Sequence, residues 1–360
     1  MTRDYSAFLP PDMKTGRSDR LHSTREKLGW QPFFAQQISV EELTETPPVR
    51  VVEVHRNALH VLGDGVDMSL PPNPEATVGD WLLLNGDRLH QSRLLQRKSL
   101  IKRRAPGSDR QVQLIAANID TAFIVSSCNQ DFNIARLERY VALAFEAEIT
   151  PVILLTKADL CENVEEFTDA ARTISEEVAV QAIDARGDAP REKLAAWCKP
   201  GKTVAFLGSS GVGKSTLTNA LSGHPLMETN TIREDDAKGR HTTTRRQLHI
   251  VPSGCVVLDT PGMRELQLTD AASGIDDVFA DLRDLSARCR FRDCQHVTEP
   301  GCAVRQAIDD GILDARRLQR WQKLQAEEAF NSSTLAERKM KDRQFGKTVR
   351  AIMKHHHKRG

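Results

Sequence analysis

Two short stretches, "TKAD" (residues 156–159) and "GSSGVGKST" (residues 208–216), decide the fold of this 360-residue chain. Both are typical of a nucleotide pocket, the first as a reader of the base and the second as a binder of phosphate. In most proteins that carry both motifs the phosphate loop comes first, whereas here it follows the other motif by about fifty residues. Either the short motif is a chance match, or the chain order of a nucleotide-binding domain has been rearranged.

The segment "TVAFLGSSGVGKSTLTNALSG" (residues 203–223) predicts a strand, a glycine-rich loop and a helix that ends at Gly223. Glycines let successive backbone N–H groups turn inward at a helix N-terminus, which makes a nest for an anion. Lys214 would neutralise the β- and γ-phosphates, and the Ser215 hydroxyl would ligate Mg²⁺. A glycine-rich turn with a chance lysine is the alternative, and the flanking strand and helix argue against it. The predicted nucleotide-binding residues of this loop are Gly208, Ser209, Ser210, Gly211, Val212, Gly213, Lys214, Ser215 and Thr216.

A further phosphate element follows in "CVVLDTPG" (residues 255–262), where an apolar strand ends at Asp259 and Gly262 comes three residues later. A carboxylate at this position can hold a Mg²⁺-bound water, and the Gly262 N–H can contact the γ-phosphate. Alone, D-x-x-G is a common turn. Because it lies 45 residues after Lys214 at a strand tip, we interpret it as part of the same pocket.

The stretch "PVILLTKADL" (residues 151–160) predicts a buried strand that delivers a polar motif to the carboxyl edge of a parallel sheet, where ligands of such sheets bind. The Asp159 carboxylate could accept hydrogen bonds from N1–H and N2–H₂ of guanine, which adenine cannot donate. The stem of Lys157 could lie over the ring. Most GTPases carry Asn where this chain has Thr156, so that one polar contact is weakened or altered. The predicted base-binding residues here are Thr156, Lys157, Ala158 and Asp159.

A weaker base signal lies in "VQAIDARGDA" (residues 180–189), where Asp184 and Ala185 follow a strand. They resemble the loop whose backbone N–H meets guanine O6, although Asp184 replaces the usual serine. Along the chain, the two predicted base-binding segments therefore come first, the phosphate loop follows, and the segment for Mg²⁺ and the γ-phosphate comes last. A GTP-binding sheet tolerates this order if its usual ends are joined, here by residues 186–202, and the chain is opened elsewhere.

The charge composition of the whole chain indicates little about its partners, whereas that of its C-terminal end indicates more. The 50 Lys and Arg residues nearly balance 49 Asp and Glu residues, whereas residues 331–360 carry a local charge of +7. Such a tail favours contact with RNA, and a solvated end without a specific partner is the alternative. No apolar run approaches the roughly 20 residues of a membrane span, and the N-terminus lacks the apolar centre of a signal peptide. We therefore expect a cytoplasmic chain without a membrane partner.

Three of the seven cysteines fall within residues 289–302, an odd clustered set that favours metal over disulfides. The pattern Cys-x₄-Cys-x-His-x₅-Cys offers three thiolates and one imidazole, which saturate a tetrahedral Zn²⁺ without leaving a water site. Reduced cysteines without metal are the alternative. Arginines surround the ligands and could contact phosphate or form a solvated rim. The predicted ligands of one structural zinc are Cys289, Cys294, His296 and Cys302.

The remaining patterns predict a multidomain chain. Short alternating runs with frequent turns indicate a small all-β, OB-like barrel, and continuous apolar strands separated by helices indicate a mostly parallel α/β sheet. A largely helical zinc-binding domain follows. The predicted limits are 1–45 for an N-terminal extension, 46–105 for the barrel, 111–283 for the P-loop GTPase domain, 284–330 for the zinc domain and 331–360 for the basic tail.

In these motifs and their order the sequence resembles the circularly permuted GTPases of small ribosomal subunit biogenesis, the RsgA (YjeQ/YloQ) family. The resemblance covers about residues 45–330 and includes "LERYVALA", "GSSGVGKSTL", "GRHTTT", "DTPGMREL" and "CRFRDCQHVTEPGCAV". It implies an OB barrel, a permuted GTPase domain and a zinc domain. It also implies a protein that binds the small ribosomal subunit and its rRNA, and that hydrolyses GTP to GDP and phosphate there during late maturation. We expect a monomer, although the sequence does not reveal the oligomeric state. An RNA-binding placeholder with incidental turnover and a P-loop ATPase or kinase are the alternatives.

The residue after D-x-x-G, where many GTPases have a water-orienting glutamine, is Met263. A thioether cannot orient water, so another group must do so. The resemblance supports His241 of "GRHTTT", with Thr243 as a Mg²⁺ ligand; a surface histidine in a loop is the alternative.

We expect His241→Ala to lower the ribosome-stimulated kcat at least tenfold, about 1.4 kcal/mol, because the attacking water loses its orienting group. GTP affinity should change little. Stopped-time phosphate release with purified small subunits measures both, and equal turnover in variant and parent would remove the assignment.

Overall fold

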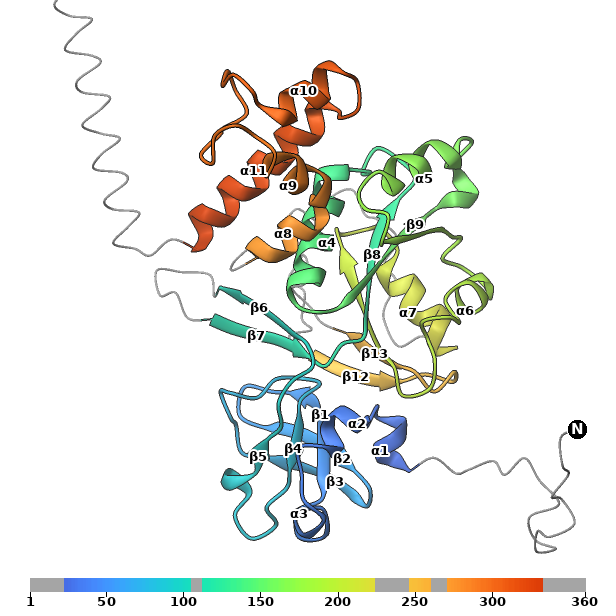
Figure 1. Cartoon of the computed structure of the whole chain (residues 1–360). Helices are drawn as coiled ribbons and strands as arrows, with labels where there is room; N and C mark the ends of the chain where they lie inside the picture. The colour runs from blue at the N-terminus through green and yellow to red at the C-terminus, as the bar shows by residue number, and fades with distance from the viewer. Residues whose placement is uncertain (1–22, 105–111, 224–245, 260–270, 333–360) are drawn as a thin grey trace, which may run out of the picture.

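The computed structural model describes residues 23–104, 112–223, 246–259 and 271–332, which form three parts along the molecule (Figure 1). A small antiparallel sheet with short helices lies at one end, a helix-covered sheet lies in the middle, and a group of helices lies at the other end. The mostly parallel central sheet and the helical C-terminal part confirm the predicted fold class. That the small sheet is an OB-like barrel stays a prediction.

The central sheet has the strand order β10-β9-β8-β11-β13-β12. Neighbouring strands are parallel except β12, which is antiparallel to β13. Every residue of β8 and β11 is buried, as continuous apolar strands covered on both faces require. The strands are β8 (Thr121–Ser127), β9 (Thr150–Thr156), β10 (Ala179–Ala182), β11 (Thr203–Gly208), β12 (Arg246–Ile250) and β13 (Val256–Asp259).

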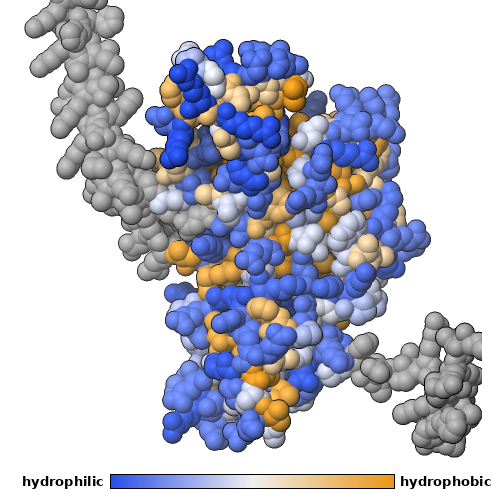
Figure 2. Space-filling view, viewed as in Figure 1, coloured by the Kyte–Doolittle hydropathy of each residue, from blue (hydrophilic) through white to orange (hydrophobic). Residues whose placement is uncertain are grey.

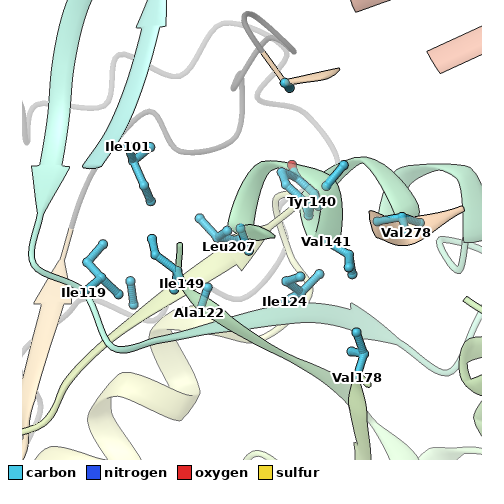
Figure 3. Packing of buried hydrophobic residues seen from close by; sticks show 14 of the residues in the cluster. Ile101, Ile119, Ala122, Ile124, Tyr140, Val141, Ile149, Val178, Leu207 and Val278 are labelled. Carbon is cyan, nitrogen blue, oxygen red and sulfur yellow. The ribbon is translucent and has the colours of Figure 1, made fainter. Parts of the chain in front are cut away.

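Helices cover both faces of this sheet and separate two apolar layers. On one face Ile124 of β8 packs with Tyr140 of α4 (Figure 3), and on the other Phe123 packs with Leu217 of α7. The alternation follows from the period of two of a strand. The helices of this part are α4 (Ile134–Glu146), the 3₁₀ helix η4 (Ala158–Leu160), α5 (Val164–Arg172), α6 (Ala189–Lys193) and α7 (Lys214–Ser222).

The N-terminal part is an antiparallel sheet on which three short helices pack. Leu28 and Phe34, from the segment expected to be an extension, are buried, and the Phe34 ring lies 5.8 Å from that of Trp81. Within the described residues this segment therefore belongs to the core of the N-terminal part. Its elements are α1 (Thr24–Lys27), α2 (Pro32–Ala35), α3 (Val40–Glu45), β1 (Pro48–Val54), β2 (Leu59–Gly63), β3 (Val66–Leu70), β4 (Trp81–Leu83), the 3₁₀ helix η3 (Leu89–Gln91) and β5 (Arg93–Leu94).

One strand pairing connects the N-terminal part with the central sheet, and a separate two-stranded hairpin lies between them in the chain. Strand β1 pairs with β12 through Glu53 and Val54, so the two sheets share a hydrogen-bonded edge. Strands β6 (Leu100–Arg104) and β7 (Val112–Ala117) form an antiparallel hairpin. The predicted boundary between the two domains falls between these hairpin strands. Figure 2 shows hydrophilic residues over most of the visible face and apolar residues near this hairpin.

The side chain of Arg50 joins the N-terminal and central parts. It is buried, with Nε 3.2 Å from the Gly79 carbonyl oxygen and an Nη atom 2.9 Å from Oγ1 of Thr203. It also donates to the carbonyl groups of Asn118, at 3.1 Å, and Leu28. Burial lowers the pKa of Arg50 to about 10, which leaves the guanidinium charged at neutral pH. One cation therefore satisfies acceptors from four separate segments.

The C-terminal part packs on α4. Gly274 of α8 lies so close to α4 that a Cβ there would be 2.1 Å from the Ala142 carbonyl oxygen. Glu138 of α4 is fully buried and accepts from Nε of Arg320 at 2.9 and 3.0 Å. Burial raises the pKa of Glu138, and the charge of Arg320 opposes that rise. The helices are α8 (Ala272–Val278), α9 (Ala280–Ser286), α10 (Ala303–Asp309) and α11 (Ala315–Ser332), and no helix of the described residues is long and apolar enough to cross a membrane.

We expect Arg50→Met to lower the free energy of unfolding by about 3 kcal/mol, because buried acceptors lose the guanidinium group and a buried unsatisfied group costs about 1–3 kcal/mol. Urea denaturation followed by tryptophan fluorescence measures the loss. Arg56→Met, at an exposed position of the same part, is the control. Equal midpoints for the two variants would contradict the linking role of Arg50.

Candidate nucleotide pocket and metal centre

The structure brings the two motifs together at one edge of the central sheet. Strand β9 ends at Thr156, β11 ends at Gly208, and β8 lies between them, parallel to both. A Cβ placed on Gly213 would lie 3.6 Å from Oγ1 of Thr156 and 3.7 Å from Cβ of Ala185. The phosphate loop therefore contacts both predicted base-reading segments, although they precede it in the chain.

The phosphate loop has the backbone that an anion nest needs. Gly208, Gly211 and Gly213 have φ values of 141°, 75° and 97°, which residues with a side chain rarely adopt. A Cβ on Gly208 would lie 2.3 Å from the Val125 carbonyl oxygen, so this position also requires glycine. Helix α7 begins after Gly213 without a side-chain cap, which leaves its first N–H groups for a ligand.

The lysine of the loop lies over the same nest. Its Nζ atom is 2.8 Å from the carbonyl oxygen of Gly208, and it also donates to the carbonyl of Ser209. From α4, Arg136 donates to Oγ of Ser209 at 2.7 Å. Arg136 was not among the predicted site residues, because its 73-residue separation from Ser209 leaves no local signal in the sequence. Two cationic side chains, Lys214 and Arg136, therefore contact the loop, and this favours binding of a polyanionic ligand.

Thr156 makes a contact that its motif alone does not reveal. It is fully buried, and its Oγ1 lies 2.6 Å from the carbonyl oxygen of Val212 in the phosphate loop. The same oxygen lies 3.1 Å from the Ser126 carbonyl. The hydroxyl group therefore links β9 to the phosphate loop. The effect of threonine in place of asparagine on base binding stays a prediction.

The other base-reading residues lie on the turn after β9. Lys157 has a left-handed backbone with φ 57°, and Asp159 lies in the 3₁₀ turn that follows, beside Ala158. The Asp159 carboxylate accepts from Arg186, whose Nε lies 3.4 Å from Oδ1 of Asp184. Sequence reasoning did not assign Arg186 to the site. The sequence feature that could have indicated Arg186 is its position directly after Asp184 and Ala185, near the end of a strand.

Several predicted residues lie outside the description. His241, Thr243 and Gly262 fall in residues 224–245 and 260–270, which the structure does not describe. Asp259 is the last residue of β13, next to the strand of the phosphate loop, and its backbone alone is described. Ser215 and Thr216 lie in the first turn of α7. Their roles toward nucleotide and Mg²⁺ stay predictions.

The four predicted zinc ligands converge in the C-terminal part. The ligand atoms of Cys289, Cys294, His296 and Cys302 all lie within 4.8 Å of one another. Sγ of Cys302 is 3.3 Å from Nδ1 of His296 and 3.9 Å from Sγ of Cys289. A tetrahedral Zn²⁺ with bonds of about 2.0 to 2.3 Å requires ligand separations of roughly 3.4 to 3.8 Å. The donor set and its spacing therefore fit one structural zinc.

Surrounding groups hold these ligands in place. The His296 ring presents Nε2 to Oγ of Ser286 at 3.0 Å and lies 5.8 Å from the ring of Trp321. Glu299 accepts from the N–H groups of Gln295 and Val297, each at 2.8 Å, and so closes the loop between His296 and Cys302. These N–H groups, that of Gln295 foremost, lower the pKa of Glu299 to about 2. Glu299 was not predicted, because its partners are backbone groups.

Comparison with known families matches residues 94–269 to the model described as RsgA GTPase. A model described as ABC transporter matches residues 192–348, which also include the phosphate loop. The curated relative "Small ribosomal subunit biogenesis GTPase RsgA 2" of Vibrio parahaemolyticus is 48% identical over 337 residues, 93% of this chain and 94% of the relative. The chain belongs to the RsgA GTPase family.

Other members of the RsgA family agree with this assignment. The RsgA of Mesorhizobium japonicum is 50% identical over 313 residues, 85% of this chain and 90% of its own. The crystal structure of YjeQ from Thermotoga maritima covers 77% of this chain with a TM-score of 0.58 at 25% identity, over 96% of its own chain. YloQ, described as a circularly permuted GTPase, covers 80% of this chain and 97% of its own with a TM-score of 0.53 at 25% identity.

RsgA membership confirms that the reversed motifs reflect a permuted GTPase, and it makes the chain a GTP hydrolase with GTP, GDP and Mg²⁺ at its site. The ATPase and kinase alternative is thereby set aside. The limits of the domains and the roles of single residues are not decided by these matches.

We expect Glu299→Ala to weaken zinc binding at least tenfold, because residues that orient metal ligands typically contribute 10- to 100-fold in affinity. Competition with a chromogenic zinc chelator at neutral pH measures the change. Glu176→Ala, at an exposed position of the central part, is the control. Unchanged zinc affinity in Glu299→Ala would show that the loop holds its shape without this carboxylate.

Proposed function

We propose that the chain is a GTPase of small ribosomal subunit biogenesis, which binds the small subunit and hydrolyses GTP to GDP and phosphate during its late maturation. The relatives' names supply the ribosomal context. The observation that carries the proposal is the hydrogen bond from Thr156, at the start of the base-reading motif, to the carbonyl oxygen of Val212 in the phosphate loop, at 2.6 Å. Monomeric state and cytoplasmic location are further parts of the proposal.

In this proposal the phosphate loop binds the nucleotide and the turn after β9 selects its base. The inward N–H groups and Lys214 hold the phosphates, while Asp159 accepts from the guanine edge. Ser215 and Asp259, with Thr243, are the residues that would hold Mg²⁺, which would neutralise charge on the β- and γ-phosphates. His241 would orient the attacking water.

The C-terminal part supplies a surface suited to rRNA. Exposed arginines surround the zinc ligands, and the Arg290 guanidinium lies 5.5 Å from the centre of the exposed Phe291 ring. Guanidinium groups bind phosphate oxygens, and an aromatic ring offers a face for base stacking. With residues 331–360 as a basic tail, these groups would hold the protein on the subunit. The exposed arginines are Arg288, Arg290, Arg292 and Arg305.

The domain limits are part of the same proposal. We place a barrel at 46–105, a GTPase domain at 111–283 and a zinc domain at 284–330, after an extension at 1–45. The buried Glu138 of α4, which accepts from Nε of Arg320 on α11, supports a close union of the last two domains.

We expect Asp159→Asn to transfer subunit-stimulated hydrolysis from GTP to xanthosine triphosphate. Xanthine carries a carbonyl where guanine carries N2–H₂, and the Asn amide can donate to that carbonyl. Single-turnover assays with and without purified small subunits should show strong stimulation of GTP hydrolysis in the parent. In the variant, the stimulated rate of GTP hydrolysis should fall at least tenfold, and the rate of hydrolysis of xanthosine triphosphate should rise.

Asp169→Asn is the matched control, since this aspartate is exposed on α5 and forms an ion pair with Arg172 of the same helix. Parent turnover that small subunits leave unchanged would favour a placeholder whose hydrolysis is incidental. An Asp159→Asn variant that still prefers GTP would reject the base assignment.

A further inference from the structure

Arg186 occupies the carboxylate that the proposed function assigns to guanine. Its guanidinium donates to Oδ2 of Asp159 through one Nη atom. Its backbone N–H and Nε lie 3.0 and 3.4 Å from Oδ1 of Asp184. The arginine thus lies between two carboxylates, one from the turn after β9 and one from the segment after β10. The Asp159 side chain is 25% exposed and that of Arg186 is 66% exposed, so the arginine covers the carboxylate from the solvent side.

A guanidinium matches the donors of guanine. The Watson–Crick edge of guanine offers N1–H and N2–H₂ on one N–C–N unit, and the arginine side chain offers neighbouring N–H groups on a planar N–C–N unit with a full positive charge. A carboxylate binds either of them by the same two oxygens. Because Arg186 already donates to Oδ2 of Asp159, guanine cannot bind both oxygens of this carboxylate while the arginine stays there.

We propose that Arg186 is an internal competitor of the base: it binds the Asp159 carboxylate that the proposed function assigns to guanine, and GTP or GDP must displace it. This inference rests on the proposed role of Asp159. It makes Arg186 a residue that lowers nucleotide affinity, in contrast to the neighbouring residues that raise it.

The proposal also explains what Asp184 does in place of the usual serine. Two of its contacts hold Arg186, one on the backbone and one on the side chain. A serine hydroxyl could also accept hydrogen bonds but would supply no negative charge. Asp184 therefore stabilises the arginine in its position over Asp159, and the departure from the family pattern strengthens the competitor.

Arg186 is exposed, so the size of the effect is modest and depends on salt. Exposed ion pairs contribute little, and we expect about a two- to fivefold effect on affinity at low ionic strength. Screening should reduce it in about 0.5 M salt. A structural role in folding is not expected, because the side chain lies outside the apolar layers.

Equilibrium titration of the full-length protein with fluorescent GDP tests the proposal. Arg186→Ala should bind GDP about two- to fivefold more tightly than the parent at low salt, with a smaller difference at high salt. Asp184→Ser should also bind GDP more tightly than the parent, by a smaller factor than Arg186→Ala. Arg172→Ala, which removes an exposed arginine paired with Asp169 on α5, should leave affinity unchanged.

Two results would overturn the proposal. Weaker GDP binding by Arg186→Ala would show that the arginine contacts the bound nucleotide, and unchanged binding at low salt would show that it does not compete. Titration of Asp159→Asn with guanosine and xanthosine diphosphates distinguishes a failure of the base assignment of Asp159 from a failure of the competitor role of Arg186. If that variant does not turn to the xanthosine nucleotide, the base assignment itself fails; if it does, a failure of Arg186→Ala concerns Arg186 alone.

Discussion

The hydrogen bond between the Thr156 hydroxyl and the Val212 carbonyl oxygen holds the nucleotide pocket together. It connects the end of the strand that precedes the base-reading turn to the loop that binds phosphate. Both groups are buried, and a buried carbonyl without a donor is costly, so the two segments are held at a fixed separation. A nucleotide has a fixed length between base and phosphates. The pocket can therefore keep its dimensions whichever segment comes first in the chain.

Helix α4 extends this arrangement to the C-terminal part. Near its N-terminus Arg136 reaches Ser209 of the phosphate loop, and half a turn later Glu138 is buried against Arg320 of α11. Arg317 supports the same contact, because one of its Nη atoms donates both to Asp281 and to the Val278 carbonyl group. A buried carboxylate is tolerated only when it is paired, so removal of either partner would loosen α11. The zinc cluster is thus attached to the helix that also contacts the nucleotide loop.

At the opposite end, Arg50 performs a comparable function for the N-terminal part. Its guanidinium reaches carbonyl groups of the first helices and of the turn before β4, and the Thr203 hydroxyl of β11. The strand β11 that begins at Thr203 ends in the phosphate loop. Arg50 holds the N-terminal part to the central part, and the pair of Glu138 with Arg320 holds the C-terminal part to it. These two contacts of buried charged side chains therefore orient both flanking parts relative to the nucleotide pocket.

The sequence by itself determined the chemistry that depends on local spacing: the glycines and lysine of the phosphate loop, the Cys₃His ligand set, and the parallel strands recognised by continuous apolar runs. It also indicated the permutation, because motif order is written along the chain. The tertiary structure alone decided which partners meet across distance. Arg186 and Asp159 are 27 residues apart, Thr156 and Val212 are 56, Arg50 and Thr203 are 153, and Arg320 and Glu138 are 182. Glu138 lies among buried apolar residues of α4, yet its burial depends on an arginine of another part. No local pattern encodes such pairs, because burial of a charge is stable only when folding brings its partner to it.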